Sequence, residues 1–287
     1  MNLTNNQSVN ENNKGKRLQI YCYGTSLLFF LFALFYCQLL IYLSRKSVFF
    51  EVSVSIGLII IALPFLKKGE NFHTVKRLLI IETYFNFICI ALKLTSLLEI
   101  TRFSTLFDWM FLVFFILQIG GFIVFQTKEK AWLSLPSTIS MSIAIFYWAY
   151  QCVGQGSGLG SNNEIYFWGS DVPLYLQWTY GFWLLTLVVI QYASALPKLT
   201  FLLVHLASYC VALTSSEFFH ARVLTACHLF VLNALFVFAA QDWINQHFAS
   251  INHLTTFKTG KIPHYILALA LNIGTISCTL LYIFNEA

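Results

Sequence analysis

The chain has 287 residues, of which 58% are hydrophobic and 10% are charged, and its formal net charge is +5. Soluble domains carry about a quarter charged residues, so this composition excludes a water-soluble globule. It predicts an all-α integral membrane protein that is a polytopic helical bundle in the lipid bilayer. The positive residues lie mainly between apolar runs, as membrane orientation requires, so nucleic acid is not an expected partner. Seven scattered cysteines without a CxxC pair argue against a disulfide framework or a metal site.

The chain begins with residues 1–17, which are polar and rich in asparagine and predict a disordered cytoplasmic tail. Apolar runs follow, and a run of roughly 20 residues is long enough for a membrane-spanning helix. The sequence predicts nine such spans, of which the seventh is the shortest, at about 19–43, 48–66, 78–98, 104–126, 132–152, 173–195, 197–214, 219–240 and 263–284.

The distribution of lysine and arginine predicts the orientation of these spans. With the N-terminus in the cytoplasm, twelve of the 17 basic residues lie on the cytoplasmic side, four lie outside and one lies within a span. This bias favours a multi-pass protein with nine transmembrane helices. We divide the membrane part into an N-terminal three-helix segment, 18–100, and a C-terminal six-helix segment, 101–287.

The third run contains polar residues at helical spacing. Glu82, Asn86, Cys89, Lys93 and Ser96 follow one another at intervals of 4, 3, 4 and 3 residues, which places them on one face of a helix. Charges inside a membrane are costly, so this face is expected to point into the bundle, towards a cavity, a ligand or a partner helix. The alternative is that Lys93 extends its stem to the outer surface or forms a structural ion pair.

Asp108 opens the fourth run on the same membrane side as Lys93. The connection between the third and fourth runs is short, so the two helices are expected to be antiparallel neighbours. An ion pair between Lys93 and Asp108 is therefore predicted, because it would lower the cost of both charges.

The seventh and eighth runs contain His205 and His228. No pair of histidines has the spacing of a haem or metal site, so hydrogen bonds between helices are the expected role. In the last run, Asn272, Thr275 and Thr279 share one face and are expected to pack inward.

The longest outer connection contains "GQGSGLGSNN" followed by "IYFWGS". No strand precedes these glycines and no Lys–Ser/Thr pair follows them, so they predict a flexible connector rather than a nucleotide-binding loop. The aromatic residues after them predict an interfacial patch. No GxSxG or HExxH motif occurs. This absence argues against an enzymatic activity but does not exclude one.

One part of the chain is similar to a known family. The fifth run ends in "FYWAY", and the sixth contains Tyr180, Trp183 and Thr186. This pattern, over about residues 105–284, resembles microbial, bacteriorhodopsin-like rhodopsins, whose third helix lines the retinal pocket. The resemblance implies retinal or another hydrophobic pigment as a cofactor. The chain lacks the helix that carries the retinal lysine, and Phe182 stands where the pump carboxylate would be.

We therefore expect a membrane protein that binds or conducts a small ligand, an ion or a hydrophobic cofactor. A degenerate rhodopsin-like pigment or sensor protein is one version of this hypothesis. Two alternatives remain open, namely a structural subunit of a larger membrane complex and an intramembrane enzyme acting on lipids or isoprenoids. The candidate binding residues are Glu82, Asn86, Lys93, Asp108, Tyr180, Trp183, Thr186, His205 and His228.

Overall fold

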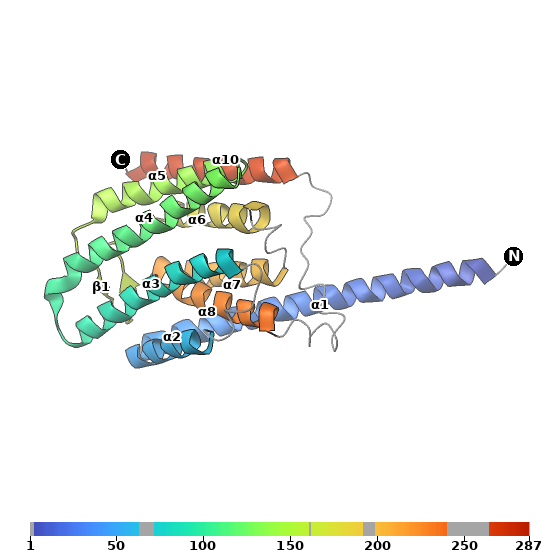
Figure 1. The fold of residues 1–287 in the computed structure, drawn as a ribbon, viewed down its shortest axis with the longest axis horizontal. Coiled ribbons are helices and arrows are strands. Elements are labelled where there is room, and N and C mark those ends of the chain that lie inside the picture. Colours follow the sequence, from blue (N-terminus) through green and yellow to red (C-terminus); the bar gives the residue numbers. More distant parts are fainter. Residues whose placement is uncertain (1–2, 63–71, 161, 192–198, 240–263, 287) are drawn as a thin grey trace.

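The computed structural model describes residues 3–62, 72–160, 162–191, 199–239 and 264–286. Helices that run roughly parallel or antiparallel to one another form a bundle (Figure 1). The described ranges contain nine α-helices, which are α1 Leu3–Lys46, α2 Val48–Ala62, α3 Phe72–Leu97, α4 Ser104–Lys128, α5 Leu135–Cys152, α6 Leu174–Leu185, α7 Leu199–Leu213, α8 Phe218–Ala239 and α10 His264–Glu286. Shorter elements are the 3₁₀-helix η1 Thr101–Phe103, the π-helix η2 Thr186–Gln191, and the antiparallel strands β1 Gly158–Leu159 and β2 Ile165–Tyr166.

Three of the described helices are long and apolar enough to cross a bilayer. They cover Gly24–Lys46, Ser104–Lys128 and His264–Asn285. Their outward faces expose large apolar side chains, which suits lipid and not water. The helical class predicted from composition is therefore confirmed, and these three helices support the membrane character by their length and composition.

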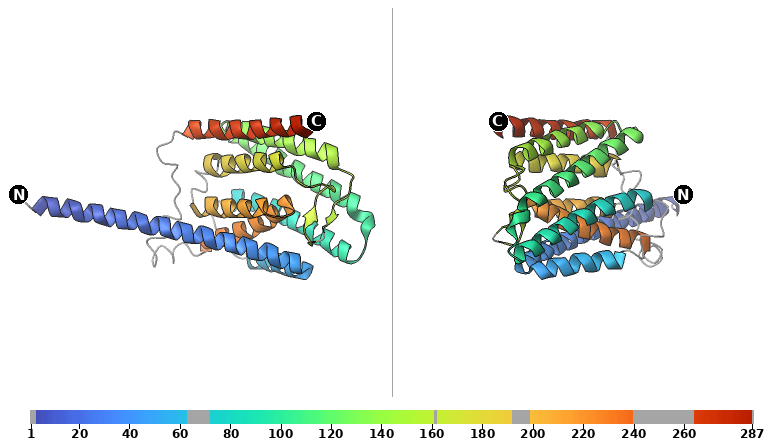
Figure 2. Two further views of the ribbon diagram at one scale, coloured as in Figure 1. Left: turned by 180° about the vertical axis from the view of Figure 1, so that it is seen from behind. Right: turned by 60° about the vertical axis from the view of Figure 1, so that its left-hand side comes forward.

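The first helix is longer than the sequence predicts. Helix α1 begins at Leu3 and extends beyond the bundle over its N-terminal part (Figure 2). The segment 1–17 was expected to be disordered because of its polar composition. Nucleation is the costly step of helix formation, so a helix that is already formed in the apolar segment continues at little cost into the preceding residues.

Helices α7 and α8 pack against the N-terminal helices. Helix α7 contacts α1, and α8 contacts α1, α2 and α3. Helix α10 instead packs against α5 and α6, and α4 packs against α3 and α5. The bundle therefore does not separate at the boundary placed near residue 100.

Polar side chains join α5 to α10. The hydroxyls of Ser137 and Thr275 lie 3.0 Å apart, and Ser140 donates to Thr279 at 2.9 Å. The Asn272 amide donates at 2.8 Å to a backbone carbonyl before α5. All three α10 residues are at most 9% exposed, which confirms the inward face predicted for this helix.

The loop between α5 and α6 is fixed by one buried carboxylate. Asp108, which is 0% exposed, accepts hydrogen bonds from the backbone amides of Gly154, Gly156 and Ser157 at 2.6–3.0 Å. The Ser157 hydroxyl donates to the same carboxylate at 2.5 Å. Gly154 and Gly156 have φ angles of 102° and 97°, which favour glycine, so the glycines shape a turn around Asp108. The expectation of a flexible connector is wrong for this segment.

The aromatic residues of the loop insert into the bundle. Phe167 and Trp168 are at most 1% exposed, and the Trp168 indole donates to the backbone carbonyl of Asp108 at 3.0 Å. The Phe167 ring lies 4.4 Å from that of Phe111, and the Trp168 ring lies 4.6 Å from that of Trp148. These two residues therefore belong to the core and not to the predicted interfacial patch.

We expect Asp108→Asn to destabilise the protein by about 2–3 kcal/mol. The amide keeps one acceptor oxygen and places a donor against backbone N–H groups, so buried donors lose their partners. Thermal unfolding of the purified protein in detergent measures this effect. Asp171→Asn, at an exposed position of the same loop, is the control and should change the midpoint little. Equal midpoints for the two variants would contradict the anchoring role.

Candidate functional site

The centre of the site is Glu51 in the first turn of α2. Ser47 separates α1 from α2, and its hydroxyl accepts a hydrogen bond from the Phe50 amide at 3.3 Å, as a helix cap does. This cap starts α2 so that Glu51 lies one turn inside the helix, where it is 2% exposed. The partial positive charge of the helix N-terminus favours a carboxylate at this position.

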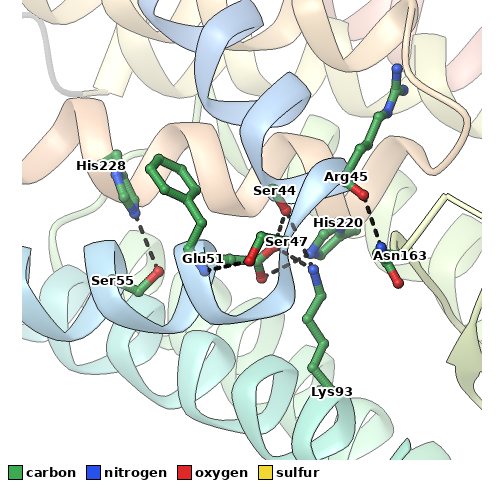
Figure 3. A network of polar contacts seen from close by, with 10 residues as sticks. Ser44, Arg45, Ser47, Glu51, Ser55, Lys93, Asn163, His220 and His228 are labelled. Carbon is green, nitrogen blue, oxygen red and sulfur yellow. Dashed lines mark hydrogen bonds and ion pairs between the residues drawn. The ribbon is translucent and has the colours of Figure 1, made fainter. Parts of the chain in front are cut away.

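The Glu51 carboxylate is contacted from three other helices (Figure 3). One oxygen forms an ion pair with the Lys93 ammonium of α3 and accepts from the Ser44 hydroxyl of α1. The other oxygen lies 3.2 Å from His220 Nε2 of α8. Since carboxylates only accept hydrogen bonds, Nε2 of His220 carries a proton. Glu51 therefore connects α1, α2, α3 and α8 at one point.

The structure corrects the position and the partner predicted for Lys93. The side chain is 0% exposed, so it does not reach the surface by extending its stem. Its ammonium contacts Glu51 and Ser44, whereas Asp108 is occupied by the loop amides. The predicted Lys93–Asp108 pair is wrong because Asp108 faces backbone donors that already satisfy it.

The polar face of α3 points inward, as its spacing predicts. Asn86 and Cys89 are 4% and 2% exposed, and Lys93 is fully buried. The side chain of Glu82 lies outside the described part of the structure. Ser96, at the end of the face, is half-buried. The burial of Asn86, Cys89 and Lys93 shows that neighbouring helices cover most of this face.

A second buried cation lies on α8. Arg222 is 2% exposed, and it donates to the Ser208 hydroxyl at 2.7 Å and to His205 Nδ1 at 3.0 Å. Its guanidinium lies 5.5 Å from the centre of the Tyr180 ring. A guanidinium only donates, so Nδ1 of His205 is unprotonated and accepts. Arg222 is one of the four basic residues that the predicted orientation places outside, whereas its side chain is buried within the bundle.

Deeper along α8, His228 joins three helices. Its Nδ1 lies 3.1 Å from the Tyr36 hydroxyl of α1, and its Nε2 lies 3.3 Å from the Ser55 hydroxyl of α2. The predicted role of His205 and His228 in hydrogen bonds between helices is confirmed. In contrast to His228, the buried Nδ1 of His220 has no hydrogen-bond partner among the described residues.

The three residues that resemble the rhodopsin pocket lie on α6 and at the start of η2. Trp183 donates to Thr138 of α5 at 3.0 Å, and Thr186 donates to a carbonyl of its own helix. Tyr180 lies beneath Arg222, as described above. None of these contacts involves Lys93, so the structure does not join the two sets of candidate residues into one site.

Sequence reasoning did not single out Glu51, and it treated His220 and Arg222 as edge or loop residues. The signal for Glu51 was present, since an acid lies one helical turn inside the second apolar run. His220 and Arg222 are the second and fourth residues of the predicted run 219–240, so the sequence indicates the end of a span and gives no signal for burial. In the structure α8 begins at Phe218, one residue before the predicted run, and both side chains are buried in the bundle.

The polar side chains of the site form ion pairs and hydrogen bonds with one another. The described residues contain no group of three His, Cys, Asp or Glu side chains that could hold a metal ion. No protein-family model, curated protein or solved structure matches the chain. The assignment of a function therefore depends on the geometry.

Glu217 lies in the turn before α8, and we expect the stability of the protein to depend on pH through its carboxyl group. Burial raises its pKa from about 4.5 to about 7, and repulsion from Asp171 and Glu164 contributes to the same direction. Because the folded-state pKa is above the unfolded value, the stabilising contribution is full below the unfolded pKa and is lost as pH rises through about 7.

We expect the thermal midpoint of the wild type to fall between about pH 5 and pH 8 by more than that of Glu217→Gln, which cannot ionise. Thermal scans of both proteins across this range measure the difference. Coincident pH profiles would show that Glu217 does not titrate as its surroundings indicate.

Proposed function

We propose that this protein is an integral membrane protein with nine spans and a cytoplasmic N-terminus, and that it transfers protons along α2 and α8. The observation that carries the proposal is the buried contact of Glu51 with both Lys93 and His220. Buried chains of Asp, Glu and His in membrane bundles are typical of proton relays. The sequence led us to expect a protein that binds or conducts a small ligand, an ion or a cofactor. The present proposal names the proton as the conducted ion.

The first part of the relay consists of Glu51, Lys93 and His220. It can hold a proton in more than one place. His220 donates through Nε2 to Glu51, while its buried Nδ1 is an acceptor that no residue in the described ranges contacts by a hydrogen bond. A proton that arrives at Nδ1 turns the ring into an imidazolium beside a carboxylate, which offsets its charge. Lys93 keeps Glu51 ionised in the absence of this proton, because an unpaired buried carboxylate is costly.

The second part of the relay consists of His228 and the two hydroxyls that it contacts. Its two ring nitrogens contact Tyr36 and Ser55, so one nitrogen accepts while the other donates. A proton added to one nitrogen can be released from the other after the two hydroxyls reorient. Imidazole is suited to this step because each of its two ring nitrogens can donate or accept a proton.

The two parts lie close enough for a bridging water. Ser55 follows Glu51 by four residues on α2, which is about 6 Å of helix rise. His228 follows His220 by eight residues, which is about 12 Å along α8. The relay thus covers a large part of one half of a hydrocarbon core about 30 Å thick. A single water between the Ser55 hydroxyl and the Glu51 carboxylate would connect the two parts.

Two other hypotheses make different use of the same residues. In a structural subunit of a larger complex, the cluster would only hold helices together and no proton would move. In a pigment protein, retinal would give the purified protein an absorption band that hydroxylamine bleaches. The relay requires neither a pigment nor a partner chain.

We expect the wild type in liposomes to dissipate an imposed pH gradient, and His228→Gln to do so at least tenfold more slowly. Glutamine keeps one donor and one acceptor for Tyr36 and Ser55, but it cannot take up a proton. A pH-sensitive dye inside the liposomes reports the flux, and thermal unfolding checks that the variant is folded.

Thr279→Val is the matched control, because it removes a hydrogen-bonding hydroxyl between α5 and α10, away from the relay. It should leave the flux at the wild-type level. Wild-type flux no faster than that of empty liposomes, or equal flux in His228→Gln, would exclude the relay and favour the structural role.

A further inference from the structure

A cleft of about 580 Å³ lies at the end of the bundle where the loop between α5 and α6 is located. It lies between the end of α3, the start of α4 and the loop that contains β1 and β2. Its volume is within the range of about 300–1,000 Å³ that is typical of small-molecule sites. Glu51, Lys93 and His220 do not line it, so the cleft is separate from the proton-transfer cluster.

The loop wall of the cleft is held in place from two sides. Asp108 binds the amide of Gly156 at 3.0 Å, next to the lining residues. On the other side, Arg45 forms an ion pair with Glu164 at 3.1 Å. The backbone carbonyl of Arg45 also accepts a hydrogen bond from the Asn163 side-chain amide at 2.8 Å. Asn163 itself has a φ of 58°, a left-handed conformation that the surrounding contacts maintain. The wall is therefore preformed, which lowers the cost of binding a ligand.

One glycine allows the close approach of an aromatic side chain in this wall. A Cβ atom on Gly158 would collide with the hydroxyl and ring of Tyr166 on the paired strand. The absence of a side chain at position 158 thus keeps the Tyr166 ring against β1, where it lines the cleft.

The lining of the cleft combines neutral polar groups with apolar surface. It contains no Asp, Glu, Lys, Arg or His side chain. The hydroxyls of Thr95 and Ser157 are already bonded to protein groups. The Asn163 and Gln155 amides donate to the backbone carbonyls of Arg45 and Gln151, which leaves their carboxamide oxygens as acceptors for a ligand in the cleft. The other polar side chains of the lining are the hydroxyls of Ser96, Ser104 and Tyr166. The apolar surface between them comes from Leu97, Ile100, Phe107 and Leu159.

We propose that this cleft binds a neutral hexopyranose, either as a free sugar or as the head group of a glycolipid. An ion would find no opposite charge in the lining to replace its hydration. A purely apolar ligand would remove water from the hydroxyl and carboxamide groups without replacing their hydrogen bonds. A hexopyranose offers hydroxyl donors and acceptors at its edge and C–H groups on its faces, which matches both kinds of surface.

Saturation-transfer NMR tests the proposal on the purified full-length protein in lipid nanodiscs that contain no glycolipid and no sugar-based detergent. The probes are the methyl glycosides of glucose, galactose and mannose, with methyl glucuronide as the charged comparison. We expect at least one neutral glycoside to bind, and the glucuronide to bind at least tenfold more weakly. The absence of binding by every neutral glycoside, or preference for the glucuronide, would overturn the proposal.

Conservative variants locate the bound sugar. Ser104→Ala and Tyr166→Phe each remove one hydroxyl from the cleft and should weaken binding at least fivefold. Ser140→Ala removes a hydroxyl between α5 and α10 and should bind as the wild type does. Equal affinity in all three variants would place the sugar elsewhere and overturn the proposal.

A competition experiment distinguishes a free sugar from the head group of a glycolipid. Nanodiscs with a glycolipid that carries the same head group should exclude the free glycoside if the cleft faces lipid head groups. Undiminished binding of the glycoside would assign the cleft to free sugar. Either result supports a hexopyranose site. Proton flux through Ser104→Ala should equal that of the wild type, so the two proposals can fail separately.

Discussion

The structure depends on the burial of an ionised pair, Glu51 and Lys93, inside an otherwise apolar bundle. Removing two charges from water costs several kcal/mol per ion, and their attraction offsets this cost only when both are well placed and hydrogen-bonded. Here the carboxylate also contacts Ser44 and His220. The turn between α1 and α2, the end of α3 and the start of α8 must therefore meet at one point. This constraint agrees with the packing of α8 against the three N-terminal helices.

A second carboxylate organises the same end of the bundle with different chemistry. Asp108 is surrounded by backbone amides and a hydroxyl, so it fixes the loop and does not neutralise a cation. The loop then inserts Phe167 and Trp168 into the core and forms the wall of the cleft. The charged cluster and the cleft thus lie at the same end of the bundle, but separate groups form them. A ligand in the cleft and a proton on His220 can be studied independently.

Several features of the fold could be predicted from sequence because they depend on one helix at a time. Composition indicates a helical membrane protein, and helical spacing gives the inward faces of α3 and α10. The absence of metal-site spacing among the histidines correctly indicated hydrogen bonds between helices for His205 and His228.

The partners of the charged residues could not be predicted in the same way, because they depend on which helices are neighbours. The short connection between α3 and α4 suggested that Asp108 pairs with Lys93, whereas the partner is Glu51 on α2. Likewise, the loop glycines suggest flexibility until the carboxylate that binds their amides is known. Arg222 looked like a charge at the outer end of a span, because the sequence does not show that Ser208 and His205 of α7 lie beside it.

The most direct test of this account is a double-mutant cycle on Glu51 and Lys93. It compares the free energies of unfolding of the wild type, Glu51→Gln, Lys93→Met and the double variant in detergent. Each single substitution leaves a buried charge or donor without its partner, so each should cost about 3–5 kcal/mol. The double variant should cost less than the sum by about 2 kcal/mol or more, because the two residues are coupled. Strictly additive effects would contradict the claim that this buried pair organises the bundle.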